Sequence, residues 1–225
     1  MADFKEIVSQ LATDQNNLQK RTKQLVAELD NISNSAEVGA YGAFTDAIER
    51  YNQPSILEIV SVTENIRSDK RFIGFISSMT NQLSTKSVNK IGQMQTRIFS
   101  EVHKSIAKAW NQNTADGFEV VININNSERK NLKSNPVDGL TVREWLQQFS
   151  GVLYNTLLKL ATKQITNETG DSNGRLLLKK QIANAFATFE KSAKRIAEFA
   201  VIKASSIAYE NGSAVFGNDE KWLSK

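Results

Sequence analysis

The single histidine, His103, is the residue whose type could most readily do chemistry in this sequence. A Ser-His-Asp site would have to use it, and a single histidine makes a histidine-based metal cluster impossible within one chain. His103 lies between Val102 and Lys104 on the polar side of a predicted helix, so we interpret it as a surface residue. The chain contains no cysteine, which excludes disulfides, thiolate zinc sites and a cysteine nucleophile.

Two further groups match only part of a metal-binding pattern. The segment 171–174 (Asp-Ser-Asn-Gly) has the start of a calcium loop but lacks the other acidic ligands and the terminal glutamate, so we interpret it as a turn. Glu49, Glu58 and Glu64 could approach one another in a bundle, but no histidine accompanies them. No glycine-rich phosphate loop is present. We therefore expect no catalytic residue, no cofactor and no metal, and expect that the protein is not an enzyme.

The segment 70–115 is more basic than the rest of the chain. The chain has 28 Lys and Arg against 24 Asp and Glu, whereas Glu101 is the one acid in this segment. The excess suits a phosphate backbone, but a solvated helix face or a match to an acidic protein surface explains it equally well. The basic residues are Lys70, Arg71, Lys86, Lys90, Arg97, Lys104 and Lys108. Candidate nucleic-acid contacts are Lys86, Lys90, Arg97 and Lys104.

The first 33 residues carry the clearest pattern, a heptad seam of about four heptads with spacings of four and three. Such a seam keeps facing a partner helix only if both helices supercoil. Gln15 and Thr22 are polar seam positions, which cost stability but restrict register. The seam consists of Phe4, Val8, Leu11, Gln15, Leu18, Thr22, Leu25, Leu29 and Ile32.

Three arrangements would satisfy this seam. The helix could pack against its own domain, associate with another copy of the chain as a coiled coil, or dock onto a different protein. The faces outside the seam are very polar, with Asp14, Asn17 and Lys20, which suits a narrow contact stripe. The weak helix formers of 31–35 predict the end of this helix.

The remaining sequence predicts further helices. A long helix is expected from Ser87 to Trp110, another from the capping box that begins at Thr141, and a last one from about Leu176 to Tyr209. A helix restart is expected at Pro54. Their expected apolar faces include Ile91, Met94, Ile98, Val102, Val152, Leu153, Leu157, Leu178, Ile182, Phe186, Phe189, Ala193, Ile196 and Phe199.

One strand and one loop interrupt these helices. Residues 118–124 alternate between apolar and polar types, which predicts a strand, and 127–139 reads as a polar, basic loop. Gly39 and Gly42 would permit close packing, or a bend after the N-terminal helix. The predicted fold is mainly α, with an N-terminal coiled-coil helix followed by a helical bundle with one or a few short β-strands.

Composition and length fit a folded chain. Hydrophobic residues make up 40% and charged residues 23% of the 225 residues, so the chain can bury a core. No secretory signal and no apolar run of about 20 residues is visible. We expect three parts: a coiled-coil helix at 1–35, a helical body at 36–210 with a β/loop insertion at about 116–140, and a tail at 211–225.

Residues 7–29, with Asn16-Asn17-Leu18-Gln19-Lys20-Arg21-Thr22 at their centre, resemble the N-terminal segments of tailed-bacteriophage virion proteins. The resemblance covers about 30 residues and carries over no functional residue. It implies a structural protein located in a virion and assembled in the host cytoplasm; without it, the expected location is cytoplasmic. Expected partners are further copies of the chain and other structural proteins, with a nucleic-acid-binding accessory protein as the alternative function.

Overall fold

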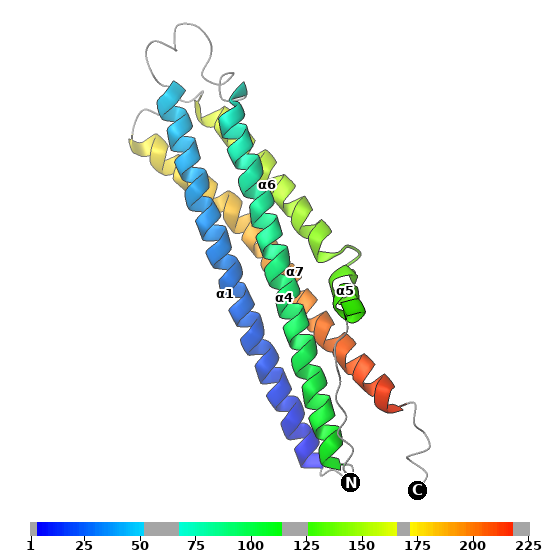
Figure 1. The fold of residues 1–225 in the computed structure, drawn as a ribbon. Coiled ribbons are helices and arrows are strands. Elements are labelled where there is room, and N and C mark those ends of the chain that lie inside the picture. The colour runs from blue at the N-terminus through cyan, green and yellow to red at the C-terminus, as the bar shows by residue number, and fades with distance from the viewer. Residues whose placement is uncertain (1–3, 52–67, 114–125, 166–171, 218–225) are drawn as a thin grey trace. The chain divides into compact units, whose positions relative to one another are not determined.

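Long helices dominate the structure, as the apolar periods of the sequence require. The computed structural model describes residues 4–51, 68–113, 126–165 and 172–217, and about 95% of these are helical. The described helices are α1 (Phe4–Tyr51), α4 (Lys70–Asn113), α5 (Asn126–Ser134), α6 (Val142–Ile165) and α7 (Ser172–Gly217) (Figure 1). The prediction of a mainly α protein built as a helical bundle is confirmed.

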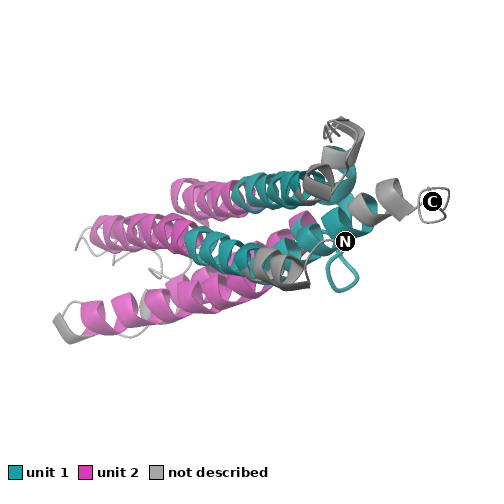
Figure 2. Cartoon of the chain, turned by 90° about the horizontal axis from the view of Figure 1, so that it is seen from below, with its two compact units in different colours: residues 1–26, 89–142, 196–225 teal, residues 27–88, 143–195 magenta. Residues whose placement is uncertain are grey.

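These helices form two compact units, each assembled from separate parts of the chain (Figure 2). Unit 1 consists of residues 1–26, 89–142 and 196–225, and unit 2 consists of residues 27–88 and 143–195. Helices α1, α4 and α7 contribute one section to each unit, whereas α5 belongs to unit 1 and α6, from Arg143 onward, belongs to unit 2.

Helix α1 continues through 31–35, where the sequence predicted its end. The asparagines and serines there are weak helix formers. Ser33, however, is buried together with Leu29, Ala40 and Phe44, and these four residues follow one another at helical spacings of four and seven. Burial of this stripe stabilises the helix more than the weak propensities destabilise it.

The segment 127–139, which was predicted as a loop, begins with helix α5. Leu132 is buried, and the alkyl chain of Lys133 lies against Gly92 of α4. Leu132 is the one apolar residue of α5, so the apolar repeat that predicted the long helices is missing here. A turn follows, in which Asp138 and Gly139 have positive φ. The described residues contain no strand, and the predicted strand at 118–124 lies outside them.

The other helix boundaries differ from the predictions mainly in length. Helix α4 begins at Lys70, well before the expected start, and α7 passes the expected stop at 211–212 and ends at Gly217. Helix α6 begins directly after Thr141, as the capping box predicted. The helix restart expected at Pro54 lies outside the described residues.

Most of the expected apolar faces are buried, with two exceptions. Phe199 on α7 was expected to face inward but is 43% exposed, and Val152 on α6 is 60% exposed. Each lies next to a buried neighbour of the same helix, Ala200 and Leu153 respectively. A helix turns by about 100° per residue, so an apolar residue beside the buried stripe can lie on the surface.

Asp69 caps the start of α4 in unit 2. Its carboxylate accepts hydrogen bonds from the amides of Arg71 (2.8 Å) and Phe72 (3.2 Å), two groups without a partner inside the helix. The guanidinium of Arg50, in the last turn of α1, lies 3.2 Å from the other carboxylate oxygen. Burial raises the pKa of Asp69, but the two amides, the Tyr51 hydroxyl and Arg50 outweigh burial and bring the pKa below its usual value.

Replacement of Asp69 by alanine should lower the free energy of unfolding by about 1–2 kcal/mol at neutral pH, because the cap is lost. A carboxyl with a lowered folded-state pKa stabilises the fold above its unfolded-state pKa, and this contribution disappears as the pH falls through the folded-state pKa. The difference between wild type and Asp69→Ala should therefore shrink below about pH 4. Urea unfolding at a series of pH values measures it.

The matched control is Glu37→Ala, which removes a carboxyl from the middle of α1 in the same unit. Its effect on unfolding should be smaller at neutral pH. A destabilisation by Asp69→Ala that stays constant down to about pH 3 would contradict the role of the ionised carboxylate.

Candidate functional site

The predicted seam is covered unevenly by the protein's own helices. Leu25 and Leu29 are fully buried, Leu18 and Thr22 are half-buried, and Gln15 is exposed. Ile32 is also half-buried, and the side chains of Phe4, Val8 and Leu11 lie outside those described. The C-terminal part of the seam therefore packs within the chain, whereas its part around Gln15 and Leu18 keeps accessible surface.

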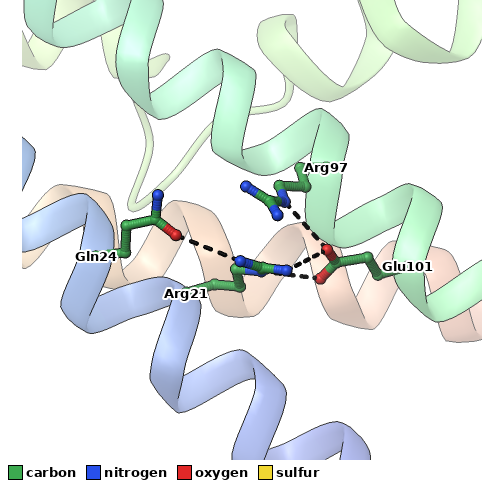
Figure 3. Close-up of polar contacts among 4 residues, drawn as sticks. All are labelled: Arg21, Gln24, Arg97 and Glu101. Carbon is green, nitrogen blue, oxygen red and sulfur yellow. Dashed lines mark hydrogen bonds and ion pairs between the residues drawn. The ribbon is translucent and has the colours of Figure 1, made fainter.

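Beside this accessible part, α1 is joined to α4 by charged groups of unit 1 (Figure 3). The Arg21 guanidinium donates two hydrogen bonds to the Glu101 carboxylate, at 2.9 and 3.3 Å, and a third to the Gln24 side chain. Arg97, one turn before Glu101 on α4, donates to the same carboxylate at 3.1 Å. Burial raises the pKa of Glu101, but the two guanidinium groups outweigh it, and the net pKa is below its usual value.

A second polar contact of unit 1 joins three helices. The Asp14 carboxylate on α1 accepts hydrogen bonds from the Ser105 hydroxyl of α4 (2.9 Å) and from the Tyr209 hydroxyl of α7 (3.1 Å). Burial, followed by the charge and the hydrogen bond of Asp14, raises the pKa of Tyr209 to about 12. Tyr209 therefore remains a hydrogen-bond donor at any physiological pH.

These contacts border a groove between α1 and α4, which we call the unit 1 groove. It has a volume of about 280 Å³. Leu18, Ile98 and Val102 supply its apolar surface, and the groups just described supply a polar rim. Its lining consists of Asp14, Asn17, Leu18, Arg21, Ile98, Glu101, Val102, Lys104 and Ser105.

The four candidate nucleic-acid contacts all lie on α4, but they do not form an uninterrupted row of cations. Lys86 and Lys104 are exposed, whereas Lys90 is half-buried. Arg97 forms an ion pair with Glu101, which also binds Arg21. Of the candidates, Lys86 and Lys104 are thus the most accessible to a phosphate.

His103 is a correction to the sequence analysis, because it is only 2% exposed. Its ring packs against Phe99, with 4.1 Å between the ring centroids. Phe99, His103 and Ala107 follow at spacings of four and are all buried, so they form a second buried row on α4. This row could have been recognised in the sequence; the immediate neighbours of His103 did not reveal it.

A larger groove lies between α1 and α4 in unit 2, and we call it the unit 2 groove. Its volume is about 700 Å³. Its two glycines, Gly39 and Gly42, were expected to permit close packing or a bend, and no site was predicted there. The lining consists of Gly39, Gly42, Ala43, Asp46, Glu49, Arg50, Arg71, Phe72 and Phe75.

The described side chains contain no group of three or more His, Asp or Glu residues placed to hold a metal ion. None of the described helices has an apolar stretch long enough to cross a membrane. The comparisons with protein-family models, with curated proteins and with solved structures found no match for this chain.

The substitution Glu101→Gln should lower the free energy of unfolding by about 0.5–1 kcal/mol, the upper part of the range for partly exposed ion pairs. The effect stays small because 37% of the Glu101 side chain is exposed and solvent screens the pair. It should shrink further at about 1 M salt. Urea unfolding at low and high salt measures both effects.

The control Glu198→Gln removes one carboxylate from an exposed position of α7 in the same unit and should have a smaller effect. If Glu101→Gln and Glu198→Gln shift unfolding equally, the contacts of Glu101 with Arg21 and Arg97 do not stabilise unit 1.

Proposed function

We propose that this chain is a structural protein that assembles, through exposed helix faces, with further copies of itself or with other structural proteins of a multi-subunit particle. The observation that carries the proposal is the uneven coverage of the seam. The heptad pattern runs through Gln15 and Leu18, yet the chain leaves Gln15 exposed and Leu18 half-exposed beside the unit 1 groove.

The chemistry around this surface supports association rather than catalysis. Leu18 is half-exposed above the buried Ile98 and Val102, and accessible apolar surface of this kind gains most from contact with another helix. Asp14, Arg21 and Lys104 stand at its edge, where charged side chains select a partner and its register. The proposed particle is a bacteriophage virion, because residues 7–29 resemble virion proteins.

Two substitutions test the seam directly. At about 1 µM protein, too dilute for a weak contact elsewhere on the chain, Gln15→Asp and Leu18→Asp should each convert the assembled protein to a monomer of 25.1 kDa, because a charge in a helix–helix seam is costly to bury. Light scattering after size exclusion gives the mass. Circular dichroism should show unchanged helix content, since Gln15 is exposed and Leu18 is only half-buried.

The matched control is Gln19→Asp, which adds the same charge to an exposed position of α1 outside the seam. It should assemble as the wild type does. If wild type is monomeric, or if the seam variants keep the wild-type mass, the chain does not assemble with copies of itself through the seam. Removal of the first 35 residues would be a poorer test, since it also removes Leu25 and Leu29 from the core.

Nucleic-acid binding is the second candidate function, and the exposure of Lys86 and Lys104 on one helix favours it. If both lysines contact phosphates, Lys86→Gln with Lys104→Gln should weaken binding and reduce the slope of log K against log salt by about 1.8 for duplex DNA. Filter binding at several salt concentrations measures this slope.

The control variant replaces Lys180 and Lys191, two exposed lysines of α7, with glutamine. It should keep the wild-type slope. Absence of DNA retention by the wild type at low salt, or an equal loss in both variants, would eliminate this function for Lys86 and Lys104.

A further inference from the structure

We infer that the unit 2 groove is a self-complementary interface, which binds the same groove of a second copy of the chain about a two-fold axis. This inference rests on the proposed function as an assembly protein and assigns it a second contact surface.

Apolar surface is exposed at this groove. Phe75 of α4 is 44% exposed, and Val38 of α1, directly before the lining residue Gly39, is 74% exposed. Water contact of the Phe75 ring in the groove, and of Val38 outside its lining, is unfavourable, and its removal favours association.

Gly42, one helical turn after Val38, leaves open space in the groove. A glycine inside a helix is less stable than an alanine at the same place. Apart from Gly42 itself, its two chain neighbours and the nearby backbone of its own helix, no atom of the described residues lies within 4 Å of the position that a Cβ of Gly42 would occupy. Nothing in the described part of the protein uses the space that this glycine leaves open, so Gly42 offers a notch to an incoming side chain.

The charged residues of the groove lining are only partly paired within the described part of the chain. Two of the four charged residues of the lining already have partners: Arg50 pairs with Asp69, and Glu49 lies 3.9 Å from Arg175. Asp46 and Arg71 have no ion-pair partner among the described residues. The groove therefore presents one acid on α1 and one base on α4.

The geometry makes these features complementary to themselves. Gly39 lies against Phe75, and Arg50 against Asp69, so α1 and α4 run in opposite directions along the groove. A two-fold axis along the groove places α1 of one copy over α4 of the other at the same height. Asp46 then faces Arg71 of the second copy, and Phe75 faces the notch at Gly42 of the second copy. Each contact occurs twice, as a two-fold interface requires.

The small number of residues that line the groove indicates a weak dimer. Nine lining residues are fewer than the roughly 20–30 per partner of a standard interface. The dimer should therefore be weak, with a dissociation constant of about 10–100 µM. Sedimentation equilibrium of the full chain in the background Leu18→Asp, up to about 500 µM protein, measures it without the contribution of the seam.

Charge reversal gives the decisive test in that background. Asp46→Arg alone and Arg71→Glu alone should each weaken the dimer by about tenfold or more, because each places like charges together twice. An equimolar mixture of the two variants should associate again, since both contacts are then between opposite charges. Native mass spectrometry, with one variant isotopically labelled, should detect the mixed dimer. No partner other than a second copy predicts this rescue.

Shape is tested by Gly42→Leu, which fills the notch and should also weaken the dimer by about tenfold or more. The control Gly151→Leu makes the same change at an exposed glycine of α6 that has open space around it. It should leave the dimer unchanged. Thermal unfolding of each variant checks that the fold is retained.

The outcomes separate this inference from the proposed function. A groove dimer in the background Leu18→Asp, lost in the single variants and regained in the mixture, supports the inference even if the seam does not assemble. The inference is wrong if the Leu18→Asp protein is a monomer at all concentrations, or if Asp46→Arg does not weaken its dimer. If the wild type assembles and only Gln15→Asp and Leu18→Asp abolish this assembly, the seam is the contact between copies and the unit 2 groove is not.

Discussion

The side chains along the buried stripe of each long helix determine how closely its neighbours approach. Helix α7 shows this most clearly. Its section in unit 2 buries large residues such as Ile182 and Phe186, whereas its section in unit 1 buries Ala197, Ala200 and Ala204. Alanine leaves the backbone of α7 accessible, and the amide of Gln95 on α4 donates a hydrogen bond, at 3.5 Å, to the carbonyl of Ala200. Small residues in the stripe thus permit polar contacts in the interior.

The elements that the sequence predicts well are those in which local chemistry and burial agree. Thr141 predicts the start of α6 because a capping box satisfies the free amides of a helix start through neighbouring residues. The face with Ile91, Ile98 and Val102 is buried as its spacing indicates. The end of α1 was predicted wrongly at 31–35, because weak propensity was given more weight than the buried stripe through Ser33.

The unpredicted features depend on contacts between residues far apart in the chain. Asp14 is joined to Tyr209 across 195 positions, and no local pattern connects an acid on α1 with a tyrosine on α7. Nor could the sequence show that the space beside Gly42 stays open, since this depends on what packs there.

The two sections of α1 are held by different interactions, which bears on where the chain can accept a partner. In unit 2, α1 buries Leu29, Phe44 and Ile48, and each such side chain contributes about 1.5–3 kcal/mol. In unit 1, α1 also buries Leu25, but the contacts of Asp14 and Arg21 on either side of Leu18 are polar, and the ion pair between Arg21 and Glu101 is partly exposed. Such pairs contribute about 0–1 kcal/mol.

A helix that approaches Leu18 therefore competes with weak polar contacts and leaves the core of unit 2 intact. The unit 2 groove instead lies beside a packed core, in which the ring centroids of Phe44 and Phe72 are 5.0 Å apart. Association at a rigid surface loses less conformational entropy, so a small interface can still bind. If both surfaces bind, the seam and the unit 2 groove would form contacts at different protein concentrations. Assembly could then proceed in ordered steps.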